Sequence, residues 1–125
     1  MRMPKTLISA ASAVAVILGG GLLTSAQAAE GEDQARIIQE GKKIAFNRKK
    51  GNCLACHAIE GGRLPGNIGP PLVNMKERFP DKAKLRAQIW DATVNNPNTI
   101  MPPFGKHGIL TEQEIDKVVE FIYTL

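Results

Sequence analysis

Apolar and small residues recur at helical spacing in the segment 33–47, at i, i+4, i+7 and i+8. They are Ile37, Gly41, Ile44 and Ala45. This spacing predicts an amphipathic helix, because it places all four residues on one face. A glycine inside a helix costs about 1 kcal/mol relative to alanine. We therefore expect Gly41 to lie where a second helix crosses closely.

A second amphipathic pattern lies at the end of the chain. Thr111 and Glu114 have the spacing of a capping box, which marks the start of a helix. Apolar residues then follow at i, i+3, i+4 and i+7, namely Ile115, Val118, Val119 and Ile122. The pattern predicts a C-terminal helix with one buried face.

A third helix is predicted from Asp81 to about Asn95. Its apolar face carries Leu85, Ile89 and Ala92. Asp81 is a suitable N-cap, because its carboxylate can accept a hydrogen bond from the first turn. The helix has to end before Pro97, because the residue before a proline avoids the helical region.

Two segments rich in glycine and proline, 61–71 and 95–108, are predicted loops. The sequence contains no internal repeat and no pattern of a strand hairpin. The predicted fold is therefore all-α, with three main helices and two long loops.

The first 28 residues differ in composition from the rest of the chain. Two basic residues precede a charge-free apolar run at 7–23, and small residues follow at Ala26 and Ala28. This order predicts a secretory signal peptide that is cleaved after Ala28. An uncleaved membrane anchor is the weaker alternative, because serines and glycines interrupt the run before it reaches about 18 continuous apolar residues. In a bacterium, such a chain would be exported to the periplasm without a membrane anchor.

Removal of residues 1–28 leaves residues 29–125, which have the length of one compact domain. It also deletes two of the 16 basic residues and none of the 12 acidic ones, so the net charge falls from +4 to +2. A charge this small gives no support to nucleic-acid binding.

A basic cluster remains at Lys42, Lys43, Arg48, Lys49 and Lys50, with Arg63 farther along the chain. Two interpretations stay open for it, a solvated helix end or a docking surface for a partner protein.

The only cysteines of the chain lie in the motif Cys53-Leu54-Ala55-Cys56-His57. Two thiols separated by two residues and followed by a histidine are typical of c-type heme attachment. Each thiol can form a thioether with one vinyl group of the porphyrin, and His57 can bind the iron. A redox disulfide is the main alternative, but the chain lacks the βαβ pattern expected around it. A structural zinc site needs four nitrogen or sulfur ligands, and outside the motif only His107 remains.

Electron transfer without binding of oxygen requires a second axial ligand. Outside the predicted signal peptide, the chain offers Met75, Met101 and His107. Met101 lies far from His57 along the chain, in a loop that two consecutive prolines stiffen. Because electron-transfer hemes use Met/His pairs, we predict Met101 as the distal ligand. His107 is the alternative, and Met75 is expected to pack in the core.

The order of helix, heme motif, Gly-Pro loop, helix, Met-Pro loop and terminal helix resembles class I cytochrome c over essentially all of residues 29–125. Gly41, Phe46 and Phe121 match helix positions of that class. More specific segments are similar to SoxX, the small monoheme subunit of the SoxAX complexes of bacterial thiosulfate oxidation. These segments are 51–57, 65–72, 89–93, and 96–97 together with 101–105. The resemblance implies the class I cytochrome c fold, with its loops wrapped around one covalently attached heme c.

The resemblance also implies roles for individual residues. Cys53 and Cys56 would hold the porphyrin through thioethers. His57 and Met101 would bind the iron from opposite sides. The carbonyl of Pro70 would accept a hydrogen bond from His57 Nδ1 and so orient the ring.

Partners and function follow from the same resemblance. In such a complex, a SoxA-like cytochrome carries the catalytic heme and joins thiosulfate oxidatively to a cysteine of the carrier protein SoxY. The present chain would accept the electrons and pass them to a soluble cytochrome. It would then be a subunit of an L-cysteine S-thiosulfotransferase without being catalytic alone. The alternative function is a stand-alone periplasmic electron carrier.

Overall fold

The computed structural model describes residues 21–125, with side chains from residue 30 onward. Its elements in chain order are α1 (Gly21–Phe46), η1 (Cys53–Ala55), α2 (Met75–Arg78), α3 (Lys82–Trp90), η2 (Ala92–Val94) and α4 (Glu112–Ile122), where η denotes a 3-10 helix. Residues 21–125 contain no strand, which confirms the all-α prediction. Of the predicted signal peptide, residues 1–20 lie outside the described part and residues 21–28 belong to α1.

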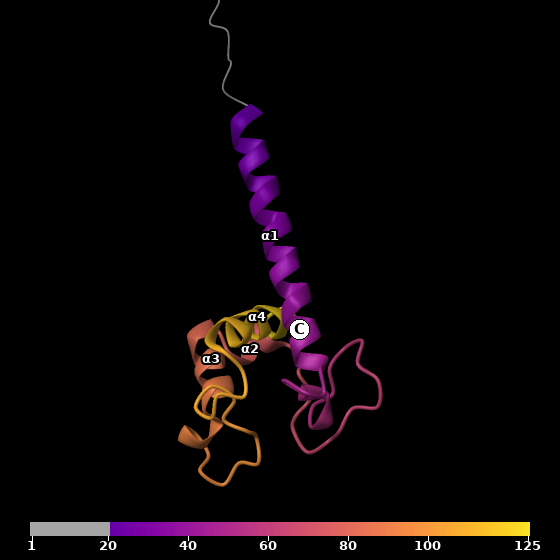
Figure 1. The fold of residues 1–125 in the computed structure, drawn as a ribbon, viewed down its shortest axis with the longest axis vertical. Coiled ribbons are helices and arrows are strands. Elements are labelled where there is room, and N and C mark those ends of the chain that lie inside the picture. The colour runs from indigo at the N-terminus through magenta and orange to yellow at the C-terminus, as the bar shows by residue number, and fades with distance from the viewer. Residues whose placement is uncertain (1–20) are drawn as a thin grey trace, which may run out of the picture.

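Helices α1 and α4 cross each other near the C-terminal end of α1 (Figure 1). Gly41 lies at the crossing, because a β-carbon there would overlap the Lys117 carbonyl and lie only 3.0 Å from Cβ of Phe121. Beside this contact, Phe46 and Phe121 meet edge to face, with ring centroids 5.8 Å apart and an interplanar angle of 84°. The close approach of the two backbones requires glycine at position 41, which confirms the prediction.

Helix α4 supplies the centre of the hydrophobic core. Thr111 Oγ1 accepts a hydrogen bond from Glu114 N at 3.2 Å, and Glu114 Oε2 accepts one from Thr111 N at 3.1 Å, which confirms the capping box. The apolar side chains of α4 are buried, namely Ile115, Val118, Val119, Phe121 and Ile122. Because each such side chain contributes about 1.5–3 kcal/mol on full burial, α4 is the main support of the fold.

Helix α3 ends at Trp90, earlier than the predicted end near Asn95. Asp81 caps its N-terminus as predicted, accepting a backbone hydrogen bond at 2.9 Å. At the other end, Asp91 has an extended backbone with φ −150°, and its carboxylate accepts a hydrogen bond from Thr93 N at 3.0 Å. That hydrogen bond starts η2, so a second capping residue divides the predicted helix in two.

The short helix α2 was not predicted from the sequence. It has four residues, which is too short for a periodic signal. Met75, its first residue, is buried as expected. Its N–H donates a hydrogen bond to Leu125 O at 2.8 Å, so α2 is tied to the C-terminus of the chain.

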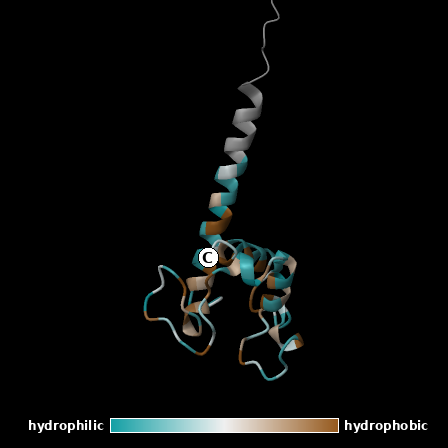
Figure 2. Cartoon of the chain, turned by 180° about the vertical axis from the view of Figure 1, so that it is seen from behind, coloured by the Kyte–Doolittle hydropathy of each residue, from teal (hydrophilic) through white to brown (hydrophobic). Residues whose placement is uncertain are grey.

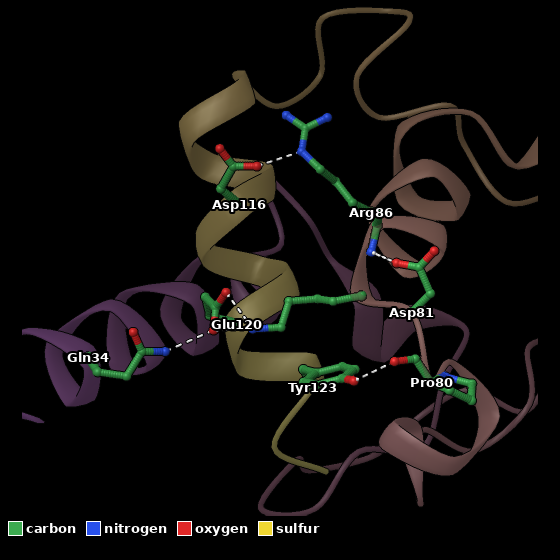
Figure 3. Close-up of polar contacts among 9 residues, drawn as sticks. Gln34, Pro80, Asp81, Arg86, Asp116, Glu120 and Tyr123 are labelled. Carbon is green, nitrogen blue, oxygen red and sulfur yellow. Dashed lines mark hydrogen bonds and ion pairs between the residues drawn. The ribbon is translucent and has the colours of Figure 1, made fainter.

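Polar side chains of α4 contact α1 and α3 (Figure 3). Asp116 Oδ1 accepts a hydrogen bond from Arg86 Nε of α3 at 2.6 Å. Glu120 Oε2 accepts one from Gln34 Nε2 of α1 at 2.8 Å. Exposed pairs of this kind contribute about 0–1 kcal/mol each, so they orient the helices more than they stabilise them.

The predicted loops 61–71 and 95–108 lie at the same end of the molecule, away from the start of α1, with one loop on each side in this view (Figure 1). Figure 2 shows hydrophobic positions within both loops. Three of these side chains are exposed, namely Leu64, Ile68 and Ile100. Within residues 21–125, none of the helices combines the length and the apolar composition that crossing a membrane requires.

Candidate functional site

A cavity of about 550 Å³ opens between the two loops and the core helices. This volume lies within the range of about 300–1,000 Å³ that is typical of small-molecule sites. Much of its wall is apolar, including Ile68, Leu72, Phe79, Leu85, Ile89, Ile100, Phe104, Leu110, Val118 and Ile122. The sequence-predicted site residues Cys53, Cys56, His57, Pro70 and Met101 all line it as well. The fold thus brings the cysteine motif and the distant Met101 loop to one cavity.

The cysteine motif forms a tight turn. Asn52, which precedes η1, has a left-handed backbone with φ 48°. The N–H groups of Cys56 and His57 both donate to Cys53 O, at 3.2 and 2.9 Å. These bonds wind the chain so that both thiols and the imidazole line the same cavity.

The environment of the two cysteines does not fit the alternative of a redox dithiol. Cys53 and Cys56 are not joined in a disulfide. Burial raises the pKa of the Cys53 thiol to about 11, so the thiol is protonated at neutral pH. Reactive thiols need a lowered pKa. The part of the chain that the structure describes also has no group of three or more Cys, His, Asp or Glu placed to hold a metal ion.

His57 is oriented by a backbone carbonyl. Its Nδ1 lies 2.7 Å from Pro70 O. Because a carbonyl oxygen only accepts, Nδ1 is the donor. A proton on Nδ1 leaves the lone pair of Nε2 free for a metal ion and increases its basicity.

The loop that carries Pro70 is bound to the cysteine motif through its backbone. Gly66 N donates to Leu54 O, and Gly69 N donates to Cys56 O, both at 2.8 Å. Neither glycine has room for a side chain, because a β-carbon at Gly66 would overlap the backbone of the motif and one at Gly69 would overlap the ring of His57. The sequence marked this segment as a loop without indicating how closely it packs.

Met101 lies on the other loop, half-buried at the wall of the cavity. Its N–H donates to Thr99 Oγ1 at 3.1 Å. Farther along this loop, the N–H groups of Gly105 and Lys106 both donate to Trp90 O, at 3.1 and 3.3 Å. The end of α3 therefore anchors the segment that presents Met101.

The two other candidates for the second axial ligand differ from Met101 in their surroundings. His107 is exposed and does not line the cavity. Met75 lines the cavity, but its Sδ already lies 3.3 Å from Nη1 of Arg78. Met101 differs from both. It lines the cavity, and among the described residues no hydrogen-bond donor contacts its sulfur.

The charged side chains that line the cavity are all basic, namely Arg48, Lys49, Lys50 and Arg78. Lys50 pairs with Glu114 and thereby lowers the pKa of that carboxyl. The sequence did not identify Arg78 as a residue of the site, because a single arginine in a short helix forms no pattern. Its Nη1 donates to Pro71 O at 2.8 Å, which holds a guanidinium beside a largely apolar cavity.

These features fit a heme c. The cavity offers two thiols, an imidazole with a free Nε2 and a thioether, which are the donors that covalent attachment and six-coordination require. Its apolar wall suits a porphyrin face. The guanidinium of Arg78 is available to the carboxylates of the porphyrin.

Comparisons with known proteins agree with this fit. Residues 36–122 match the family described as "Cytochrome C oxidase, cbb3-type, subunit III". An uncharacterized lipoprotein of Aquifex aeolicus (strain VF5) is 33% identical over 98 residues, which cover 75% of this chain and 48% of that protein. The chain thus spans about half the length of this relative.

Similarity extends to a solved structure. A chain in the crystal structure of SoxXA from P. pantotrophus is 32% identical and superposes with a TM-score of 0.62. The match covers 69% of the present chain and 79% of the SoxXA chain. It therefore includes most of the domain that contains the cavity.

Proposed function

Because the chain belongs to the cytochrome family described as cytochrome c oxidase, cbb3-type, subunit III, and is a class I c-type cytochrome of the SoxX type with a covalently bound heme c, we propose that it is the electron-accepting subunit of a thiosulfate-oxidising complex. The match to SoxXA is the observation that carries the proposal. The cavity between the cysteine motif and the Met101 loop supports it.

Four residues would hold the heme in this proposal. Cys53 and Cys56 would attach it through thioethers, and His57 and Met101 would bind its iron. The bound heme supplies a one-electron iron couple, whose potential Met/His ligation raises. Pro70 O keeps the proton of His57 on Nδ1, so that the lone pair of Nε2 would be free for the iron.

Sulfur chemistry in this proposal takes place on another chain. Cys53 and Cys56 are the only cysteines of the sequence, and both are occupied by the heme, so no thiol remains to carry sulfur. A SoxA-like partner joins thiosulfate to a cysteine thiolate of a SoxY-type carrier protein. That coupling forms one sulfur–sulfur bond and releases two electrons. The present chain accepts them one at a time and passes them to a soluble cytochrome.

The proposal includes the cellular location. Residues 1–28 act as a signal peptide, and residues 29–125 form the cytochrome domain in the periplasm. The arrangement of two basic residues, an apolar run and Ala26-Gln27-Ala28 supports this interpretation. Heme attachment to the exported chain fits this location.

Reconstitution tests the proposed function. The heme-loaded protein is mixed with the SoxA-like chain of the same organism, its carrier protein and thiosulfate, and heme reduction is followed by absorbance. We expect reduction at least tenfold faster with all components than without the SoxA-like chain. A stable complex of the two cytochromes is expected in gel filtration. A monomer that thiosulfate and the carrier never reduce would instead favour the alternative of a stand-alone electron carrier.

The basic side chains at the cavity are expected to accelerate docking of an acidic partner. Arg48 and Lys49 are exposed and line the cavity, whereas Lys50 is paired with Glu114. Reversal of both charges in Arg48→Glu/Lys49→Glu should lower the association rate about tenfold or more at low salt, because electrostatic steering depends on such charges. Stopped-flow reduction at several ionic strengths measures this effect.

Lys84 on α3 provides the matched control, because it is exposed and does not line the cavity. Lys84→Glu should leave the association rate within about twofold of the unmodified protein, since it lies away from the cavity. Rates that are independent of salt in both proteins would show that the basic cluster is only a solvated helix end.

A further inference from the structure

Gly69 lies directly against the imidazole ring of His57. A β-carbon at this position would lie 2.6 Å from Nδ1 and 2.9 Å from Nε2, and would overlap Cε1. Non-bonded heavy atoms pack at about 3.5–4.0 Å. Gly69 does not have a positive φ angle, so the backbone conformation does not demand glycine here. Glycine is required instead because the ring of His57 occupies the space that a side chain at position 69 would need.

The position of Gly69 relative to the ring is fixed by the cysteine motif. Gly69 N donates to Cys56 O at 2.8 Å, and His57 N donates to Cys53 O at 2.9 Å. Residue 69 and the ring are therefore tied to the same turn. A side chain at position 69 could not withdraw from the ring without breaking the hydrogen bond to Cys56.

One hydrogen bond alone does not fix the rotation of the ring. Pro70 O holds Nδ1 at 2.7 Å, but a ring held at one atom can still swing about that contact. Gly69 closes off the space on one face of the ring. Together, the carbonyl of Pro70 and the backbone of Gly69 restrict both the position and the angle of the imidazole.

We propose that Gly69 is a positioning residue that sets the rotation of the His57 imidazole and, through it, the electronic state of the heme iron. The inference rests on the proposed function only in that His57 is an iron ligand. The π orbital of an imidazole overlaps different iron d orbitals as the ring rotates. A change of ring angle therefore alters the magnetic signature of the iron even when the bond from Nε2 is kept.

A pair of variants of the heme-loaded protein tests the proposal. In Gly69→Ala the new methyl group displaces the ring, so we expect shifted g values in the electron paramagnetic resonance spectrum of the ferric protein. Gly66→Ala is the matched control, because the three atoms nearest to its β-carbon belong to the backbone of Ala55 and Cys56, at 2.6 Å from the Ala55 carbonyl carbon and 3.1 Å from Cys56 N, and not to the ring of His57. We expect the control to lose stability and keep the g values of the unmodified protein. Unchanged g values in Gly69→Ala, or equal shifts in both variants, would overturn the proposal.

A measurement on the unmodified protein covers the case in which Gly69→Ala does not fold. In the ferrous protein, proton magnetic resonance should show a strong nuclear Overhauser effect between an α-proton of Gly69 and Hε1 of His57. If the ring protons of His57 show the large shifts of an iron ligand without a nuclear Overhauser effect to Gly69, the proposal for Gly69 is wrong, and the proposed function is unaffected. If they lack those shifts, His57 is not an iron ligand and the proposed site itself fails.

Discussion

Protein prepared without heme is expected to lack the cooperative thermal transition of the heme-loaded protein. The cavity of about 550 Å³ is bordered by core side chains, including Ile89, Val118 and Ile122. Without heme, the apolar side chains that line this cavity face water instead of the porphyrin. Full burial of one such side chain contributes about 1.5–3 kcal/mol, so incomplete burial of several is large compared with the stability of about 5–15 kcal/mol of a typical domain. Without heme, the two loops should therefore lose their packing.

Calorimetry and circular dichroism measure this effect. The heme-free chain is produced without the predicted signal peptide, as residues 29–125, so that heme is not attached and both cysteines stay intact. We expect residual helix signal, because the contacts between α1 and α4 at Gly41 do not involve the cavity, but no sharp heat-absorption peak. The heme-loaded domain is the control. A heme-free transition within a few degrees of the control would show that the loops support themselves.

The sequence allowed correct prediction of the parts of the fold that local chemistry determines. The capping box at Thr111 and the spacing of the apolar residues after it depend on neighbouring positions, so the start and the buried face of α4 were predictable. The close helix contact at Gly41 could be predicted for a related reason. A glycine in a helix is unfavourable by itself, so its presence indicated the close contact that α4 makes there.

Other features depend on contacts between distant segments and were missed or misplaced. The sequence could not show that α3 ends at Trp90, because Ala92 continues the helical spacing of Leu85 and Ile89 and is buried as they are. Asp91 instead caps η2 and pairs with Lys106 at 2.8 Å, and Lys106 and Thr93 hold the pKa of that carboxyl below its usual range. A partner on a remote loop leaves no local pattern.

The residues of the candidate site also fall into two groups, those that could be predicted from the sequence and those that could not. The cysteines and His57 were recognisable because the attachment chemistry fixes their spacing within one turn. Arg78 and Gly69 were not recognisable. Their contacts with the cavity and with the imidazole arise only when the loop 61–71 folds back over the motif.

Replacement of Met101 by leucine is expected to remove the Met-to-iron charge-transfer band and to lower the reduction potential. Leucine has nearly the volume of methionine, so the change should cost less than about 1.5 kcal/mol of stability. It removes the sulfur that Met/His ligation requires, and this ligation raises the potential. For a one-electron couple, a fall of about 60 mV shifts the equilibrium about tenfold. We expect at least this loss in reduction by the partner, measured by redox titration and absorbance.

Met75 and His107 provide controls that separate ligand loss from general disturbance. Met75→Leu removes a sulfur from the same cavity, but that sulfur contacts Arg78 at 3.3 Å, so the band should persist and the potential should change little. His107→Ala should also leave the band unchanged, because His107 is exposed and does not line the cavity. A band that survives in Met101→Leu and disappears in Met75→Leu would reassign the distal ligand to Met75.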